Sequence, residues 1–156
     1  MVYSYYINKQ LQLQREIAMN NKTYDIFISS DLQGIHPLKI KQRRIALMDA
    51  LQDLGLNTSV YEGQYNGIRE QSYRIKGVSL GATTRKIIEI ATKLNQESIL
   101  LIETLKNTKL ASLYYTSGAF AQTLEAIGYF KEEAQKPSDG RDYSYSVKEQ
   151  TYSYIV

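Results

Sequence analysis

The chain has no cysteine, no tryptophan and a single histidine, His36, in 156 residues. Without cysteine it cannot form disulfides or bind zinc through thiolates. One histidine also argues against a histidine-based metal site and against a Ser-His-Asp triad. We therefore expect no bound metal, no cofactor and no nucleophile activated by histidine.

Long hydrophobic runs and strong charge are missing as well. No apolar run reaches the roughly 18 residues of a membrane-spanning helix, and the N-terminus lacks the basic and apolar regions of a signal peptide. The net charge of +3 is too small to indicate nucleic-acid binding by itself. We expect one cytoplasmic core domain that does not bind a membrane, with nucleic acid unlikely as a partner on charge grounds.

What is abundant is tyrosine, with 14 residues against 3 phenylalanines, and the most informative stretch is residues 60–75. Val60 and Tyr61 favour a strand, and Asn66-Gly67 is a strong signal for a two-residue hairpin turn. A returning strand then has two faces. One carries Ile68, Glu70, Ser72 and Arg74, and the other carries Arg69, Gln71, Tyr73 and Ile75. The Tyr-Ile pair can pack on a core, whereas a carboxylate placed this way is either solvated or functional.

The remaining pattern predicts alternating strands and helices. Strands are expected over 23–29, 60–65, 68–75, 99–102, 110–115, 120–124 and 128–133, with a helix over 119–126 as an alternative. Helices are expected over 38–54, ended by Gly55, and from Thr83 or Thr84 to about Leu94. A break in the hairpin's second strand is expected over 77–81. This order predicts an α+β, ferredoxin-like βαββαβ sandwich with helices on one face of an antiparallel sheet, extra C-terminal strands, and oligomerisation covering the other face.

Three segments follow from this order. Residues 1–22 are expected to form an N-terminal arm or short amphipathic helix, residues 23–134 the α+β core, and residues 135–156 a tyrosine-rich C-terminal extension. The extension alternates tyrosine and serine, so it can add a strand to a neighbour's sheet edge.

Two glutamates are the candidates for chemistry. Glu70 lies in the hairpin, and Glu103 is expected at the exit of a buried strand. They can face a common cleft or meet across an interface, and two carboxylates there favour a cationic ligand. The loop that begins at Ser29-Ser30 is either a ligand-binding loop or a polar connector. Cations in the first half of the 38–54 helix indicate either an anionic neighbour or a solvated face.

The segment Tyr61-Glu62-Gly63-Gln64-Tyr65-Asn66-Gly67-Ile68-Arg69-Glu70-Gln71-Ser72-Tyr73, followed by a helix and then by Asn95-Gln96-Glu97-Ser98-Ile99-Leu100, resembles a family of small phage proteins that degrade S-adenosylmethionine. These enzymes have been called hydrolases and are now understood as lyases. The resemblance extends from about Tyr24 to Phe130. It implies a homotrimer of ferredoxin-like subunits with active sites between them. It also implies cleavage of S-adenosylmethionine to 5′-methylthioadenosine and homoserine lactone, in which the substrate's own carboxylate attacks.

The resemblance also implies roles for individual residues. Glu70 matches the hairpin glutamate that anchors the substrate's ammonium group, and Glu103 matches the acid at the end of the fourth strand. The substrate-binding candidates are Tyr61, Tyr65, Ser29, Ser30 and Ser72, with a tyrosine near the sulfonium and the Ser29-Ser30 loop near the adenosine.

The implied biological role is protection of phage DNA from methylation-dependent restriction. Two alternatives stay open: a non-catalytic anti-defence binder of a small nucleotide, and a nucleic-acid-binding or protein-binding module.

Overall fold

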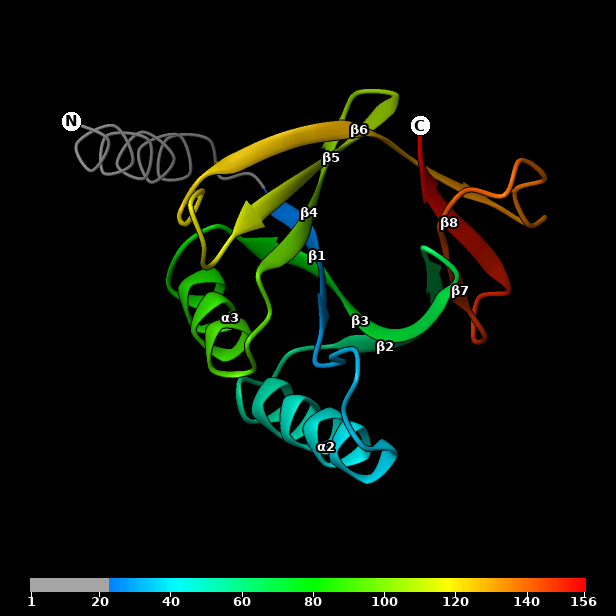
Figure 1. Cartoon of the computed structure of the whole chain (residues 1–156). Helices are drawn as coiled ribbons and strands as arrows, with labels where there is room; N and C mark the ends of the chain where they lie inside the picture. The colour runs from blue at the N-terminus through cyan, green and yellow to red at the C-terminus, as the bar shows by residue number, and fades with distance from the viewer. Residues whose placement is uncertain (1–22) are drawn as a thin grey trace.

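Eight antiparallel strands close into a barrel, in the order β1-β3-β2-β7-β8-β6-β5-β4 (Figure 1). The computed structural model describes residues 23–156, so the arm predicted for residues 1–22 lies outside the described residues. The strands are β1 (Thr23–Ser29), β2 (Thr58–Tyr65), β3 (Ile68–Ser79), β4 (Ser98–Leu105), β5 (Thr108–Tyr115), β6 (Leu124–Glu133), β7 (Tyr143–Ser146) and β8 (Thr151–Ile155). The helices are α2 (Pro37–Asp53) and α3 (Ala82–Lys93). Neither described helix is long and apolar enough to cross a lipid bilayer.

This architecture contradicts the predicted ferredoxin-like βαββαβ sandwich. That prediction assumed an open sheet with helices on one face and a neighbouring subunit on the other. Instead the sheet curls on itself, and β5 to β8 cover the face opposite the helices. The tail pairs within its own chain rather than with a neighbour, because β7 pairs with β2 and β8 pairs with β6. Closure removes the two sheet edges that β2 and β6 would otherwise expose.

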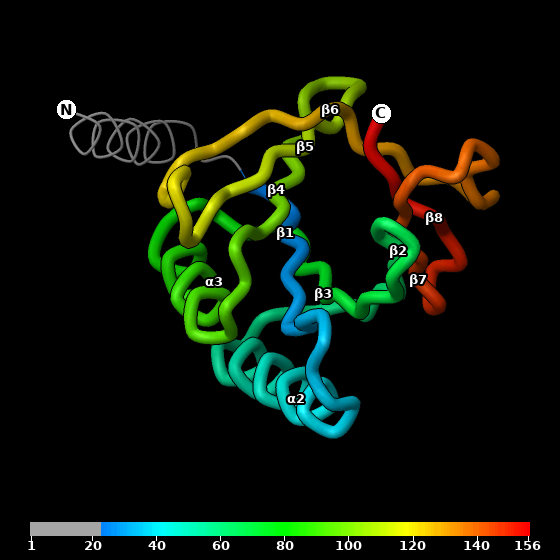
Figure 2. Tube along the Cα trace, viewed as in Figure 1, coloured from blue at the N-terminus to red at the C-terminus, as the bar shows by residue number. Residues whose placement is uncertain are grey.

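The alternation of side chains in the strands separates two hydrophobic cores. Ile26 and Ile28 of β1 face outward and pack with Leu47 and Leu51 of α2 and with Ile87 of α3. Helix α3 also contacts β3 and β4, and both helices lie on one side of the barrel (Figure 2). The inner core, which fills part of the barrel, is made of Phe27, Tyr61, Ile102, Ala111 and Phe130.

The hairpin between β2 and β3 forms as predicted. Asn66 and Gly67 have φ values of 52° and 77°, as a type I′ turn requires. Tyr73 and Ile75 pack in the outer core with the helices. The opposite face of β3 therefore points into the barrel, and it carries Glu70, Ser72 and Arg74.

Several other predicted boundaries differ from the structure. β3 does not break at residues 77–81 but continues to Ser79, and Gly77 within it has a φ of 67°. β4 continues to Leu105, so Glu103 lies inside a strand rather than at its exit. Neither the strand expected over 120–124 nor the alternative helix over 119–126 forms, because residues 117–122 make a turn and β6 begins at Leu124.

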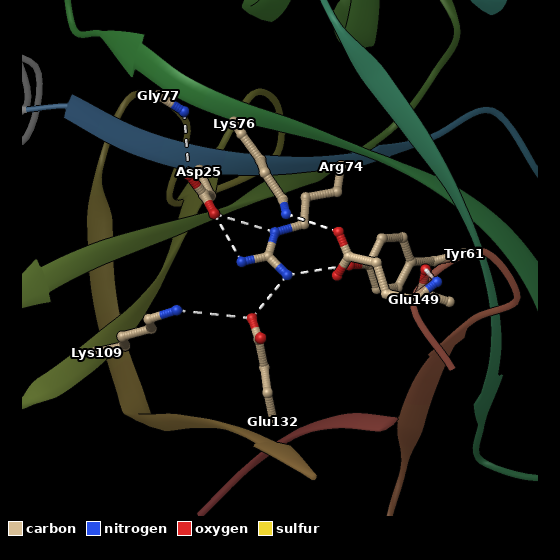
Figure 3. Close-up of polar contacts among 9 residues, drawn as sticks. Asp25, Tyr61, Arg74, Lys76, Gly77, Lys109, Glu132 and Glu149 are labelled. Carbon is tan, nitrogen blue, oxygen red and sulfur yellow. Dashed lines mark hydrogen bonds and ion pairs between the residues drawn. The ribbon is translucent and has the colours of Figure 1, made fainter. Parts of the chain in front are cut away.

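A buried arginine occupies part of the barrel interior. Arg74 is 2% exposed. Its Nε and Nη2 donate to Asp25 Oδ2 at 3.0 and 2.7 Å, and its Nη1 lies 2.7 Å from Glu132 Oε1 and 3.0 Å from the Tyr61 hydroxyl (Figure 3). Burial lowers the pKa of Arg74, but the hydrogen bonds to Asp25 and Tyr61 outweigh burial and raise it overall. The guanidinium therefore stays charged and joins β3 to β1, β2 and β6.

We predict that Arg74→Met lowers the free energy of unfolding by about 3 kcal/mol, because it removes the cation that pairs with Asp25 and leaves Glu132 with only Lys109, at 3.7 Å. Asp25 and Glu132 keep side-chain exposures of 23% and 28%, so partial rehydration limits the loss. Urea denaturation measures the effect. Arg69→Met, on an exposed residue of the same strand, is the matched control. Equal free energies for the two variants would contradict the prediction.

Candidate active site

A cavity of about 660 Å³ lies inside the barrel, next to the Arg74 cluster. Its volume falls in the range of roughly 300–1,000 Å³ that small-molecule sites occupy. Its apolar wall consists of Phe27, Leu100, Leu113, Ile127, Phe130 and Ile155. Its polar wall includes Ser29, Tyr65, Glu70, Ser72, Ser144 and Ser153. The cavity therefore combines one half-buried carboxylate, Glu70, with hydroxyl groups and aromatic rings. The exposed carboxylates Glu97 and Asp142, and Arg141, also line it.

Glu70 is the carboxylate that β3 directs into this cavity. Burial raises its pKa, and the charge of Asp31 raises it further, whereas the Ser29 hydroxyl and the charge of Arg44 lower it. Within residues 23–156, Glu70 forms no ion pair. A desolvated carboxylate without a cation of its own is suited to bind a cationic ligand.

The loop after β1 is held against β3 by polar contacts. The Ser29 hydroxyl lies 2.7 Å from the Gln71 carbonyl oxygen and accepts the Asp31 amide at 3.1 Å. The Asp31 carboxylate accepts the Gln71 amide at 2.9 Å and two hydrogen bonds from Arg44, at 2.8 and 2.6 Å. Asp31 is thus an anionic neighbour of Arg44, which agrees with one of the two interpretations of the cations in the 38–54 helix. These bonds hold Ser29 and the loop that follows it against β3.

Tyr65 lies on β2, opposite the tail. Its hydroxyl hydrogen-bonds to the hydroxyl of Ser144 in β7. A Cβ at Gly63 would collide with the Tyr65 ring, so the glycine is what allows the ring to fold back across its own strand. Burial raises the pKa of Tyr65, and the phenol is therefore neutral at ordinary pH.

The structure brings together four of the seven predicted site residues and separates three. Ser29, Tyr65, Glu70 and Ser72 all line the cavity. Tyr61 is fully buried beside Phe27 and accepts a hydrogen bond from Arg74. Ser30 is buried, and its carbonyl oxygen accepts Arg43 Nε at 2.7 Å. Glu103 pairs in register with Tyr24 of β1 and Leu110 of β5, and it is not among the residues that line the cavity.

Sequence reasoning missed the contribution of the tail to the cavity. Ser144, Ser153 and Arg141 all line it. The signal was present as small hydroxyl residues at a period of two, in Tyr-Ser-Tyr-Ser at 143–146 and Tyr-Ser-Tyr at 152–154. Such alternation places serines on one face of a strand, but only the closed sheet turns that face inward.

In the described part of the chain, no group of three or more histidine, aspartate or glutamate side chains is placed to hold a metal ion.

Comparison with models of protein families gives a match to the S-adenosylmethionine lyase family over residues 26–156. A comparison with curated proteins found no match. The matched range begins in β1 and includes both strands of the tail, so it contains every residue that lines the cavity. Because the match covers well over half of its length, the chain belongs to the S-adenosylmethionine lyase family.

Proposed function

We propose that the chain cleaves S-adenosylmethionine to 5′-methylthioadenosine and homoserine lactone inside the barrel cavity. Family membership supplies the substrate. The observation that carries the proposal is Glu70, a desolvated carboxylate without an ion pair in the described chain, in a cavity with aromatic walls. Glu70 binds the substrate's ammonium group and thereby places the methionine half of the substrate.

The reaction needs no group from the protein as nucleophile. A carboxylate oxygen of the substrate attacks its own Cγ, the bond from Cγ to sulfur breaks, and the electron pair of that bond stays on sulfur. The sulfonium becomes a neutral thioether, and the carboxylate becomes the ester of the lactone. The charges balance without water or a proton. The protein's contribution is to hold the folded conformation in which oxygen and Cγ are close.

The walls of the cavity favour this step on electrostatic grounds. A negative carboxylate and a positive sulfonium both lose charge on the way to the transition state. Water stabilises the charged reactant more than the less polar transition state, so removing water lowers the barrier. Phe27, Leu113, Ile127 and Phe130 form such a water-poor wall. Tyr65 lines the same cavity as Glu70, and an aromatic ring there can stabilise the sulfonium by a cation–π contact.

The biological role that we propose follows from the consumption of this substrate. Restriction-modification systems of the host cytoplasm that depend on S-adenosylmethionine lose it when a phage enzyme degrades it. The support is the resemblance of the 61–73 and 95–100 segments to phage enzymes with this activity.

We predict that Glu70→Gln leaves the fold intact and lowers kcat/KM for S-adenosylmethionine by about two orders of magnitude, because the ammonium loses its charged partner. Chromatography of 5′-methylthioadenosine measures the rate. Glu62→Gln, at an exposed position of β2, is the matched control, and Glu103→Gln tests the second predicted acid. Wild-type rates in the Glu70 variant would show that the carboxylate is merely solvated. Substrate that binds and is recovered intact from the wild type would indicate a non-catalytic binder.

We predict that kcat/KM falls on acidification at a pH above 4.5, the ordinary pKa of a glutamate. Only the ionised carboxylate attracts the ammonium, and burial raises the pKa of Glu70, so protonation removes activity at a higher pH than usual. Ser29→Ala removes a hydroxyl that lowers this pKa and should move the acid limb to still higher pH. Ser117→Ala, in an exposed turn, should leave the limb in place. A limb that stays fixed or moves to lower pH in Ser29→Ala would oppose the assignment.

We predict, from the resemblance alone, that the protein is a homotrimer whose subunits meet near the sites. Light scattering at several concentrations measures the mass directly. A mass near the 17.9 kDa of one chain would leave the barrel cavity as a site complete in a single subunit and would remove the predicted inter-subunit sites.

A further inference from the structure

Two serine hydroxyls in the barrel are buried without a hydrogen-bond partner among the described residues. Ser72 of β3 is 5% exposed and Ser153 of β8 is 3% exposed, and both line the cavity. Most buried polar side chains in folded proteins are hydrogen-bonded, because an unpaired one loses its bonds to water and gains nothing in return. Two such hydroxyls on the wall of one cavity therefore point to a ligand that pairs with them.

The register of the strands places both serines near the Arg74 cluster. Ser72 lies between Glu70 and Arg74 on the inward face of β3. Ser153 is opposite Glu132 in the pairing of β6 with β8, and the Glu132 carboxylate contacts Arg74. Ser72 thus lies one inward position from Glu70 toward Arg74. Ser153 lies between the two groups, because it is opposite Glu132 in β6 and opposite Ser144 in β7, and Ser144 is in register with Gly63 and, beyond it, Glu70.

Aromatic rings lie near Arg74 as well. Phe27 and Phe130 line the cavity, and the Arg74 guanidinium lies 5.4 and 5.3 Å from their ring centres. Both rings therefore pack against the Arg74 guanidinium, which is itself fixed by its ion pairs with Asp25 and Glu132. This half of the cavity offers flat apolar faces and two hydroxyls, and the Arg74 charge behind it is already neutralised.

The distribution of charge decides which half of the substrate enters this region. The ammonium and the sulfonium are costly to bury without an anionic partner, so they stay with Glu70, and the carboxylate, bonded to the same carbon as the ammonium, goes with them. Adenosine is uncharged, has a flat base, and carries hydroxyls, ring nitrogens and an amino group. Resting on the function proposed above, we propose that Ser72 and Ser153 form the adenosine subsite and hydrogen-bond to the nucleoside from opposite walls of the barrel.

The test uses 5′-methylthioadenosine, which carries the nucleoside but neither the ammonium nor the sulfonium. We expect Ser72→Ala and Ser153→Ala each to weaken its binding by about three- to tenfold in calorimetry, the effect of one hydrogen bond. Glu70→Gln should bind 5′-methylthioadenosine like the wild type while losing turnover of S-adenosylmethionine. Without ligand, both serine variants should unfold at the same urea concentration as the wild type or a higher one, because no protein hydrogen bond is lost.

Thr151→Val is the matched control. Its Oγ1 is also buried without a partner in the described chain, and it lies on the same face of β8, two residues before Ser153, but it does not line the cavity. The control should bind 5′-methylthioadenosine like the wild type. A structural role for buried hydroxyls on β8 would instead weaken binding alike in Thr151→Val and Ser153→Ala, and it would oppose the proposal.

The possible results separate this proposal from the proposed function. Wild-type affinity for 5′-methylthioadenosine in both serine variants, in an enzyme that still turns over, overturns the subsite alone. Equal weakening in Glu70→Gln overturns the orientation of the substrate. The wild type could also bind the nucleoside but never cleave S-adenosylmethionine. If the serine variants then bind the nucleoside more weakly, the subsite is supported and the proposed reaction is overturned.

Discussion

The structure depends on one buried cation that must be neutralised from several walls at once. Arg74 projects from β3 into the barrel, where an unpaired charge would be strongly unfavourable. Its partners come from three other strands, with Asp25 on β1, the Tyr61 hydroxyl on β2 and Glu132 on β6. These bonds cross the interior and hold distant parts of the sheet at a fixed separation. The space that they leave on the other side of Phe27 and Phe130 is the cavity, so the group that stabilises the barrel also shapes the site.

Closure of the barrel has a second consequence for function. β7 and β8 are short, but they place serines opposite the wall formed by β1 and β3. Without them the cavity would be an open groove on a half-covered sheet, and Glu70 would be solvated. The family match includes these strands and runs to residue 156, whereas the resemblance seen in the sequence ended near Phe130. The tail therefore belongs to the same unit as the hairpin that carries the acid.

Local signals in the sequence were sufficient to predict the hairpin and the inward face of β3. Asn66-Gly67 specified the turn, and period-two alternation put Glu70 and Ser72 on one face and Tyr73 on the other. Barrel closure could not be predicted in this way, because the pairing of Tyr61 with Ser146 joins segments far apart in the chain and neither segment encodes its partner. Tyr61 was predicted to bind substrate for the same reason. Its actual role, hydrogen bonding to the buried Arg74, depends on the closed barrel and could not be inferred from the sequence. Glu103 was expected at the exit of the strand over 99–102, but β4 continues to Leu105.

The site reconciles two demands that oppose each other. A carboxylate that binds an ammonium must be ionised, which favours water, whereas the loss of charge in the proposed reaction favours a dry cavity. Burial raises the pKa of Glu70, which is the electrostatic penalty of the dry wall, and the Ser29 hydroxyl and the charge of Arg44 partly offset it. Arg44 acts at a distance and is itself bound to Asp31, so it lowers the penalty without forming an ion pair that would compete with the substrate. An acid placed in this way has no ion pair among the described residues and remains free to bind a cation.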